Sequence, residues 1–526
     1  MRKTLPTILF LVLSVLTLPS QAQEQTVINE SFSSLASWNG SGDYNGWTTT
    51  NCSKSSDNAT FLIGTTASYG SLTTPALQGV GGRFYKLRFS YKTADGSKKS
   101  VGFKMSLNNA TFASTGTGKS SLEFKISKNE WATTREYIIL CKDENNVTVT
   151  FSTESGGESS DKRVCIDDIS ITTYNYFYSA SVNTNLSSAW TSGNITNADR
   201  GTLLLILASN GNSSSEKSLT FSGESNVYDA TDQKTYSISA SSAAVIEIPV
   251  YHQTSSSFKF SLTGTSSITV KYIYACNLPA VTLRDTDSEE TVNALLNEYV
   301  DKWVNVTLSG RTLSKDYWNS LCLPFDMENY RCNALFGNIR NCRKYTGVDG
   351  NVLTFTAPEG NETFTAGTPF IVKPAATLAS LLFGCVKIKT TEPQTVTNGD
   401  YSLKGTYGKH TLATDGTNLF LSTDGHFYIP SADKAVMNGL RAYIVQPAGG
   451  EARTLRISGI ADGDDSATAI TTARGGGVAA TAVYDLSGRR VAVYDLSGRR
   501  VANGLNAGRR LSRGMYISGG RKFFIK

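Results

Sequence analysis

The sequence predicts an all-β protein of tandem β-sandwich domains, with one connecting helix and a small β domain at the C-terminal end. Apolar and polar residues alternate with a period of two in most segments, which is typical of strands that bury one face. The composition agrees with an extracellular β protein, because Tyr, Phe, Gly, Ser, Thr and Asn are abundant and only 18% of the residues are charged. One segment has the period of an amphipathic helix.

The first 22 residues have the order of a secretory signal peptide. Arg2 and Lys3 supply positive charge, Leu5–Leu18 is a short apolar run, and Ser20–Ala22 offers small residues for cleavage. The run is too short to cross a bilayer and no other run reaches that length, so we expect no transmembrane span in the mature chain. A bacterial lipid anchor would need Cys directly after the cleavage site, and this position is Gln23, so no lipid anchor is expected.

Residues 26–173 are predicted to form the first β-sandwich. Its clearest strand carries one apolar face made of Tyr85, Leu87, Phe89 and Tyr91. The segment opens with Asn29–Phe32 and closes with Val164–Ile171. This opening and closing pair resembles the jelly-roll modules of carbohydrate-binding, MAM-like and adhesin proteins. The resemblance implies a jelly-roll-like sandwich that binds glycans or host and matrix proteins.

Many modules of that kind hold a structural calcium between an early acidic residue and one in the last strand. The resemblance therefore implies a calcium site at Glu30 with Asp167 or Asp168, since carboxylate oxygens suit that ion. The alternative is that these acids are solvated or hydrogen-bonded at strand ends.

Three aromatic residues, Trp38, Tyr44 and Trp47, cluster in the Gly- and Asn-rich opening of this domain. Exposed rings among Asn, Asp and Gly would suit stacking on sugars, and Trp38 and Tyr44 are the predicted ligand-binding residues. Trp47 precedes the β-prone run Thr48–Thr50 and is expected to fill the core instead.

Residues 174–281 are predicted to form a second sandwich, whose topology the pattern leaves open. Leu203–Leu207 is apolar throughout, so this strand should be buried on both faces. Glu247 alternates outward from an apolar strand and is interpreted as a solvated residue.

The helical segment, residues 282–302, is predicted to connect the second and third domains. Thr286 and Glu289 have capping-box spacing, and acids fill the first turn. One face then carries the apolar residues Val292, Leu295, Leu296 and Tyr299. We expect this face to pack on a neighbouring sheet, and partner binding is the alternative.

A third β domain is predicted over residues 303–460. It contains Trp318–Phe325, which reads WNSLCLPF, and Gly367–Lys373, which reads GTPFIVK. These strings resemble a β domain that recurs near the C-termini of Bacteroidota surface proteins, and the resemblance implies a scaffold role. Residues 461–476 are expected to be a flexible linker. Within it, Ser466 fits the Asp-Ser-apolar pattern of Bacteroidota O-glycans and is a predicted glycosylation site.

The tail, residues 477–526, contains a duplicated decapeptide. AVYDLSGRRV occurs at Ala482–Val491 and again at Ala492–Val501, and each Leu-Ser-Gly-Arg unit is expected to make a tight turn. A second motif, ending in a basic hairpin, follows at Leu511–Lys526.

The distinctive positions of this tail are Tyr494, Asp495, Gly498, Arg499, Leu511, Gly514, Tyr516, Arg521, Lys522 and Lys526. They resemble the C-terminal sorting domain of type IX (Por) secretion cargo in the Bacteroidota. The resemblance implies that the secretion machinery is a partner, and that the protein is secreted or reaches the cell surface through the outer membrane. An ordinary terminal hairpin is the alternative.

The chain has eight cysteines, and an even number in an exported protein permits disulfides. Cys332 and Cys342 are the predicted pair, because a loop could return between them. Cys276 and Cys322 lie in apolar strand patterns, where buried free thiols are equally expected. No CxxC spacing occurs, so no zinc site is expected.

The net charge of the chain body helps to exclude one class of binding partner. The tail carries ten Arg and Lys against two Asp, a net charge of +8, whereas the whole chain carries +6. Without the tail and the +2 of the leader, the body carries −4, which argues against a nucleic-acid partner.

The histidines His252, His410 and His426 are isolated, and no HExxH or GxSxG motif occurs. A surface binding protein for glycans or matrix proteins is therefore the first hypothesis. A carboxylate-dependent extracellular hydrolase and a structural stalk are the alternatives.

Overall fold

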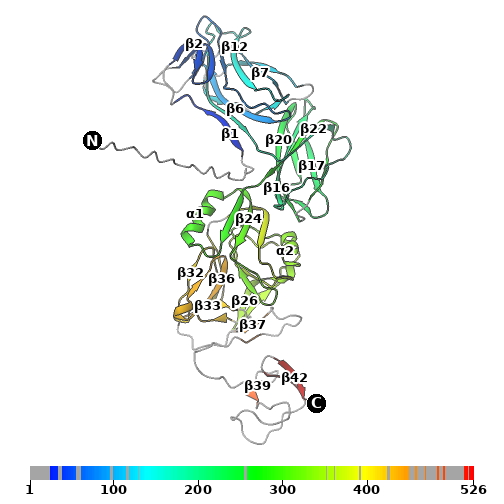
Figure 1. Cartoon of the computed structure of the whole chain (residues 1–526), viewed down its shortest axis with the longest axis vertical. Coiled ribbons are helices and arrows are strands. Elements are labelled where there is room, and N and C mark those ends of the chain that lie inside the picture. Colours follow the sequence, from blue (N-terminus) through cyan, green and yellow to red (C-terminus); the bar gives the residue numbers. More distant parts are fainter. Residues whose placement is uncertain are drawn as a thin grey trace, which may run out of the picture. The chain divides into compact units, whose positions relative to one another are not determined.

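The computed structural model divides into two compact units, Met1–Ile470 and Thr471–Lys526 (Figure 1). It describes residues 24–448 apart from gaps at 34–37, 55–60, 95–98, 114–117, 128–129, 135, 254–256, 351, 361, 390–391 and 423–426, and then the short strands 456–458, 468–469, 483–484, 490–491, 514–518 and 521–525. The predicted signal peptide lies outside the described residues. Within them, no helix is both long and apolar enough to cross a membrane.

The first domain is a network of thirteen antiparallel strands around one apolar core. The strand order is β8-β11-β6-β13-β4-β3-β5-β12-β7-β9, and β1, β10 and β2 attach to β13, β6 and β3. The strands are β1 (Gln25–Glu30), β2 (Trp38–Tyr44), β3 (Trp47–Lys54), β4 (Phe61–Ile63), β5 (Ser71–Thr73), β6 (Phe84–Thr93), β7 (Val101–Asn108), β8 (Ala110–Phe112), β9 (Ser121–Ile126), β10 (Ala132–Thr133), β11 (Tyr137–Cys141), β12 (Thr148–Glu154) and β13 (Val164–Thr173).

The alternation expected for β6 is confirmed, since Tyr85, Leu87 and Phe89 are all buried in this core. β1 pairs with β13 in antiparallel register, with Glu30 opposite Ile169. The segments that open and close the domain therefore lie side by side in one sheet.

The second domain is a sandwich of a five-stranded sheet, β14-β22-β16-β20-β18, and a four-stranded sheet, β15-β21-β17-β19. Its strands are β14 (Tyr178–Asn185), β15 (Trp190–Thr191), β16 (Gly201–Asn210), β17 (Lys217–Gly223), β18 (Val227–Asp229), β19 (Thr235–Ile238), β20 (Ser242–His252), β21 (Phe260–Thr263) and β22 (Ile268–Asn277). The central strand β16 is buried along its whole length, as predicted for Leu203–Leu207.

The third domain begins earlier than predicted, because the helix is a crossover within it. β23 (Ala280–Arg284) and β24 (Trp303–Ser309) pair in parallel, and α1 (Glu289–Tyr299) connects them (Figure 1). Val292 and Leu296 pack into the core of this domain, as the apolar face predicts. The N-cap is Ser288, whose side chain accepts from the Thr291 amide at 3.2 Å, so the helix starts after the predicted Thr286 cap.

The rest of the third domain consists of short sheets around two apolar clusters. Its other elements are β25 (Asn319–Leu321), α2 (Asn329–Phe336), β26 (Cys342–Asp349), β27 (Val352–Thr356), β28 (Phe370–Val372), β29 (Leu381–Lys387), β30 (Thr395–Asn398), β31 (Tyr401–Thr406), β32 (His410–Thr411), β33 (Asn418–Leu421), β34 (Phe427–Tyr428), β35 (Val436–Met437), β36 (Arg441–Val445), β37 (Arg456–Ser458) and β38 (Thr468–Ala469). The sequence did not predict α2. β38 pairs with β37, so part of the expected linker is an ordered strand.

A shared core joins the three domains. Phe84 and Ile138 of the first sandwich, Leu205 and Tyr274 of the second, and Cys385 of the third belong to one buried cluster. β16 therefore has one face in the core of its own sandwich and the other face in the shared core. This explains why the strand is apolar throughout.

The second unit contains a four-stranded sheet with the order β40-β39-β41-β42. The first decapeptide copy supplies β39 (Val483–Tyr484) and β40 (Arg490–Val491), which pair in antiparallel register. The predicted terminal hairpin is confirmed as β41 (Gly514–Ser518) paired with β42 (Arg521–Ile525).

Candidate functional site

A cleft of about 810 Å³ lies between the second sandwich and the third domain, and we call it the interdomain cleft. One wall is the β17–β18 region and the other is the start of α2. Among its lining residues are the amide and hydroxyl side chains of Ser222, Asn226, Gln253, Asn329, Asn333 and Thr363. Its surface is therefore rich in groups that both donate and accept hydrogen bonds.

Local backbone geometry shapes both walls. Between β17 and β18 the chain turns tightly at Gly223, where a Cβ atom would lie 2.0 Å from the Val227 carbonyl oxygen. Asn226 adopts a positive φ of 66° in the same turn. On the opposite wall, α2 ends at a C-cap formed by Gly337, which has a φ of 86°. The backbone N–H of Gly337 donates a hydrogen bond to the Asn333 carbonyl.

A stack of tyrosines connects the two walls. The rings of Tyr228, from β18, and Tyr330, from α2, are nearly parallel at 13° with centroids 4.3 Å apart. Tyr251, from β20, lies 5.6 Å from Tyr330. Burial raises the pKa of Tyr330, so its hydroxyl stays neutral. Tyr228 and Tyr330 are both lining residues of the cleft.

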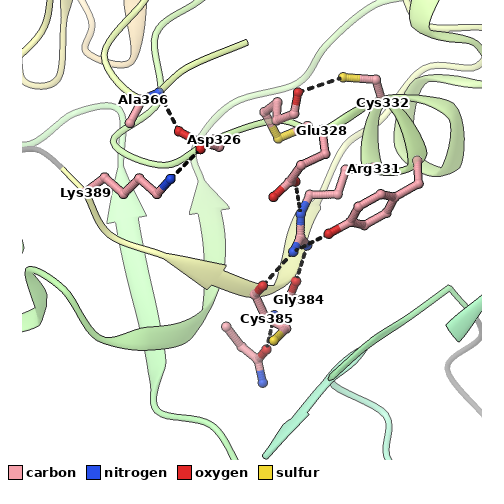
Figure 2. A network of polar contacts seen from close by, with 11 residues as sticks. Asp326, Glu328, Arg331, Cys332, Ala366, Gly384, Cys385 and Lys389 are labelled. Carbon is pink, nitrogen blue, oxygen red and sulfur yellow. Dashed lines mark hydrogen bonds and ion pairs between the residues drawn. The ribbon is translucent and has the colours of Figure 1, made fainter. Parts of the chain in front are cut away.

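Arg331 fixes α2 against the rest of the protein (Figure 2). Its side chain is fully buried, Nε donates to Glu328 Oε2 at 2.6 Å, and Nη2 donates to the Cys385 carbonyl at 2.6 Å. Nη1 donates to the Gly384 carbonyl. The guanidinium also lies over the Tyr251 ring, 4.6 Å from its centroid.

The charge of Arg331 is stable in this position. Burial lowers its pKa, but the Glu328 carboxylate and other neighbours raise it by more, so the pKa lies above its ordinary value. The guanidinium is a planar cation with donors in a fixed fork, and here it holds two carbonyls and a carboxylate in a geometry that the compact ammonium of Lys lacks. The position of Tyr330, one residue earlier, follows from this anchor.

The two less exposed carboxylates of the cleft are engaged within the protein. Asp229 accepts from the Thr231 amide at 2.9 Å, the Lys234 amide at 3.1 Å and the Tyr236 hydroxyl at 2.5 Å. Glu328 is paired with the buried guanidinium. A glycosidase needs an acid and a second carboxylate directed at the scissile bond. These two groups instead accept hydrogen bonds from the turn after β18 and from the buried guanidinium.

The predicted exposure of Tyr44 is wrong. Tyr44 is only 6% exposed and belongs to the core of the first sandwich. A turn at Asn45 and Gly46, both with positive φ, pairs Tyr44 with Trp47, so the two rings share the inward face. Trp47 fills the core as expected.

The second predicted ligand residue, Trp38, is half-buried and packs against that core. Its ring lies 5.1 Å from Tyr44, and its Nε1 atom is buried without a hydrogen-bond partner. The predicted aromatic pair therefore forms part of the packing of the first sandwich, and its rings do not make an open stacking platform.

The acids predicted to bind calcium lie at one end of the β1–β13 pair. Glu30 Oε1 accepts from the Phe32 amide at 2.6 Å, and Asp167 Oδ1 accepts from the Asp168 amide at 2.9 Å. Asp168 Oδ2 accepts from Ser90 Oγ at 3.3 Å. These bonds match the hydrogen-bonded alternative considered for the three acids.

Charge at this end of the pair is nevertheless crowded. Burial raises the pKa of Asp167 to about 6, and the charges of Asp168 and Glu30 add to the increase while Lys54 opposes it. No group of three metal-binding side chains occurs among the residues that the structure describes. The carboxylate oxygens of Glu30, Asp167 and Asp168 are nevertheless suitable calcium ligands, so the calcium site stays a prediction.

The predicted disulfide is absent. Cys332, in α2, and Cys342, at the start of β26, are both free and buried. Their thiols are hydrogen-bonded neighbours, and burial raises the pKa of Cys342 well above its ordinary value. The remaining six cysteines are also free and buried, as considered for Cys276 and Cys322. Cysteine acts here as a small apolar core residue.

Most sorting and modification residues lie beyond what the structure describes. Gly514 and Tyr516 are in β41, whereas Asp495, Gly498, Leu511, Lys526 and Ser466 are outside the described residues. The cleft residues Tyr228 and Tyr330, and Arg331, which anchors Tyr330, were missed by sequence reasoning. Nothing local marks them, because their roles depend on contacts between domains.

No family model matches the chain, and no curated protein matches it. Among solved structures, the N-terminal CBM22-1–CBM22-2 tandem domain of Paenibacillus barcinonensis Xyn10C is 8% identical, covering 49% of this chain and 98% of its own, with a TM-score of 0.23. The CBM22-1 xylan-binding domain of the same protein is 10% identical, covering 30% and 98%, with a TM-score of 0.22.

A third similar structure is the K3 cleaved adhesin domain of Lys-gingipain from Porphyromonas gingivalis. It is 15% identical, covering 28% of this chain and 99% of its own, with a TM-score of 0.21. Likenesses at these TM-scores carry no conclusion about the function of this chain.

Proposed function

We propose that this chain is an exported binding protein that holds a glycan in the interdomain cleft. The observation that carries the proposal is the stacked pair Tyr228 and Tyr330 beside a concave lining of amide and hydroxyl groups. The xylan-binding and adhesin domains named above are too distant to add to it. The proposed location differs from the sequence-based one, which was the first sandwich.

The chemistry of the cleft suits a polyol. Side-chain amides such as Asn226 and Gln253 offer a donor and an acceptor on one group, as adjacent sugar hydroxyls require. The tyrosine rings offer apolar area with a polar tip and lose little conformational entropy on binding. A concave site with a few directed polar groups is also the usual form of a small-ligand site.

The cleft is preorganised, which favours binding. Tyr228 and Tyr330 come from different domains, and Arg331 holds the second ring through its bonds to Glu328 and Cys385. Because the walls are fixed before the ligand arrives, little of the interaction energy is lost to ordering them.

Binding is tested on a glycan array with the mature chain from Gln23. Wild-type protein is expected to retain specific glycans, and Tyr228→Ala is expected to weaken their affinity by about tenfold or more. The matched control is Tyr69→Ala, which removes a tyrosine that is 40% exposed on the first sandwich. The control should bind as wild type does.

Two results would contradict the proposal. One is an array without any retained glycan, which would favour the structural stalk. The other is unchanged affinity in Tyr228→Ala when its thermal midpoint equals that of wild type. Asp232→Asn, at a side chain that is 86% exposed, probes the rim of the cleft with little effect on folding.

We also propose that the leader and the tail direct the chain to the cell surface or medium, with the type IX machinery as partner. Deleting Leu511–Lys526 should trap the protein in the periplasm, whereas deleting Ala482–Val491 should leave export intact. An insertion of ten residues preserves the alternation of facing side chains, so one copy can be removed without changing the register of β41 and β42. Cell fractionation decides this, and surface delivery without Leu511–Lys526 would refute it.

A further inference from the structure

A second cleft, of about 490 Å³, lies within the third domain, and we call it the cationic cleft. Its lining includes three basic residues, Arg311, Lys434 and Arg441. No Asp or Glu is among the lining residues that the structure describes. The interdomain cleft differs in this respect, since Asp229, Asp232 and Glu328 are among its lining residues.

Two arginines of the cationic cleft share one buried carboxylate. Arg441 Nη2 lies 2.9 Å from Asp285 Oδ2, and Asp285 is 1% exposed. Arg311 is 3% exposed and donates to the carbonyls of Leu440 and Ser320, neither of which supplies a formal charge. One positive charge in this group is therefore without a carboxylate of its own.

Unsatisfied donors mark the same pair. Nε of Arg311 and Nε of Arg441 are both buried without a hydrogen-bond partner. Burial, followed by repulsion from Arg441, lowers the pKa of Arg311 well below its ordinary value. A buried donor without a partner destabilises the folded state, so this cluster would gain from an added anion nearby.

Apolar and aromatic side chains form part of the remaining lining, beside the polar residues Thr312, Asn319, Ser320, Ser422 and Asn438. Phe420 of β33, Val436 and Met437 of β35, and the rings of Tyr317 and Trp318 surround the basic groups. Val436 is 62% exposed, the highest value among the exposed large hydrophobic residues of the described chain. An exposed apolar side chain beside an excess of positive charge favours a ligand that has both characters.

We propose that the cationic cleft binds an organic carboxylate attached to an apolar or aromatic body. The carboxylate would lie near Lys434 and Arg441, where it adds the missing negative charge. The body would cover Val436 and Phe420, removing apolar surface from water. This site is independent of the proposed glycan site, which lies in a different cleft. Small aromatic acids and the free C-terminus of a peptide share this chemistry.

The test is a titration of the mature chain with matched probes, followed by calorimetry. Phenylacetate and N-acetylphenylalanine are expected to bind, and N-acetylphenylalaninamide is expected to bind at least about tenfold more weakly. Acetate and inorganic phosphate should both have lower affinities than the two aromatic acids. Affinity for the acids should decrease with added salt, because part of the attraction is between exposed charges. A peptide ending in Phe with a free carboxylate, compared with phenylacetate, distinguishes the two sources.

Variants locate the site. Lys434→Gln removes an exposed cation of the lining and should weaken acid binding about two- to fivefold, as for an exposed ion pair. Lys404→Gln removes an exposed lysine of the same domain that does not line the cleft, and it should bind as wild type does. Equal affinity for the acid and its amide would overturn the proposal, as would equal effects of the two lysine variants. Tight phosphate binding would overturn the role of the apolar body.

Discussion

Lys86 Nζ, on β6 of the first sandwich, lies 2.8 Å from Glu247 Oε1, on β20 of the second sandwich. The Tyr174 hydroxyl donates to the same carboxylate oxygen at 2.6 Å. Glu24 is a second and longer partner of Lys86, at 3.4 Å. Glu247 keeps the outward and solvated position that its strand pattern predicts, with 42% of its side chain exposed, and it also contacts the neighbouring domain through this ion pair.

Replacing Glu247 by Gln should lower the free energy of unfolding by about 1–2 kcal/mol, because the buried ammonium of Lys86 loses its closest charge partner. The partial exposure of Glu247 keeps this below the loss for a fully buried pair. Thermal unfolding of the mature chain measures it. Glu123→Gln is the matched control, since the Lys104–Glu123 pair has the same 2.8 Å separation on an exposed surface. An equal loss in both variants would contradict the interdomain role.

Arg331→Ala should be the more damaging change, costing about 3–5 kcal/mol, because Glu328 and two backbone carbonyls lose a buried cation. Arg331→Lys should recover only part of this, since an ammonium lacks the planar fork. Urea unfolding of the mature chain gives the values. Arg88→Ala, at a side chain that is 61% exposed, should leave stability nearly unchanged. A fully stable Arg331→Ala protein would refute the anchor.

The pH dependence of the third domain should depend on His410. Burial, followed by repulsion from Lys404, lowers the pKa of His410 below its usual 6.5, and Nε2 lies 3.1 Å from the Tyr443 hydroxyl. The folded state thus disfavours the protonated ring. The stabilisation is complete above pH 6.5 and is lost as the pH falls through the lower folded-state pKa.

Comparing thermal midpoints of wild type and His410→Gln between pH 7.5 and 4.5 tests this. The difference between the two proteins should change below pH 6.5, with wild type losing more stability than the variant. Lys409→Gln, at the neighbouring exposed residue, should follow wild type across the whole range. Parallel curves for all three proteins would show that His410 does not contribute.

Calcium should stabilise the first sandwich, if the acids at the β1–β13 end bind it. Adding millimolar Ca²⁺ to the mature chain at neutral pH is expected to raise the thermal midpoint, and a chelator should reverse the effect. Glu30→Gln and Asp167→Asn should each abolish the response, since both remove a carboxylate ligand. A midpoint that is insensitive to both calcium and chelator would leave the hydrogen-bonded arrangement as the complete account of these acids.

The free cysteines give a chemical prediction. Burial raises the pKa of Cys52, Cys165 and Cys322, among others, so few thiolates exist at neutral pH. The folded protein should react slowly with a thiol reagent, whereas all eight thiols should react after unfolding without reductant. Six reactive thiols after unfolding would instead indicate one disulfide, with Cys332 and Cys342 as the first pair to examine.

The sandwiches were predictable because strand periodicity is a local property. β6 and β16 follow directly from the spacing of apolar residues in a short window, and so does the face of α1 that carries Val292 and Leu296. The parallel pairing of β23 with β24 was not predictable, because it depends on which strand the chain returns to after the helix.

The candidate site could not be predicted for a related reason. Tyr228 and Tyr330 lie in different domains, and a single sequence does not show that their rings stack. α2 has only eight residues, too few for its period to stand out. Outward-facing residues such as Lys86 and Glu247 look the same in a sequence whether water or another domain faces them. The proposed glycan site depends on those interdomain contacts.

The double burial of β16 sets a limit on how the protein can be dissected. A fragment made of residues 174–281 alone would lose the packing partners of Leu203, Leu205 and Leu207. One whole face of its central strand would then be exposed to solvent. Such a contiguous apolar patch promotes aggregation. Insolubility of that fragment would reveal nothing about its binding ability. Ligand screens should therefore use a polypeptide in which the three domains remain together.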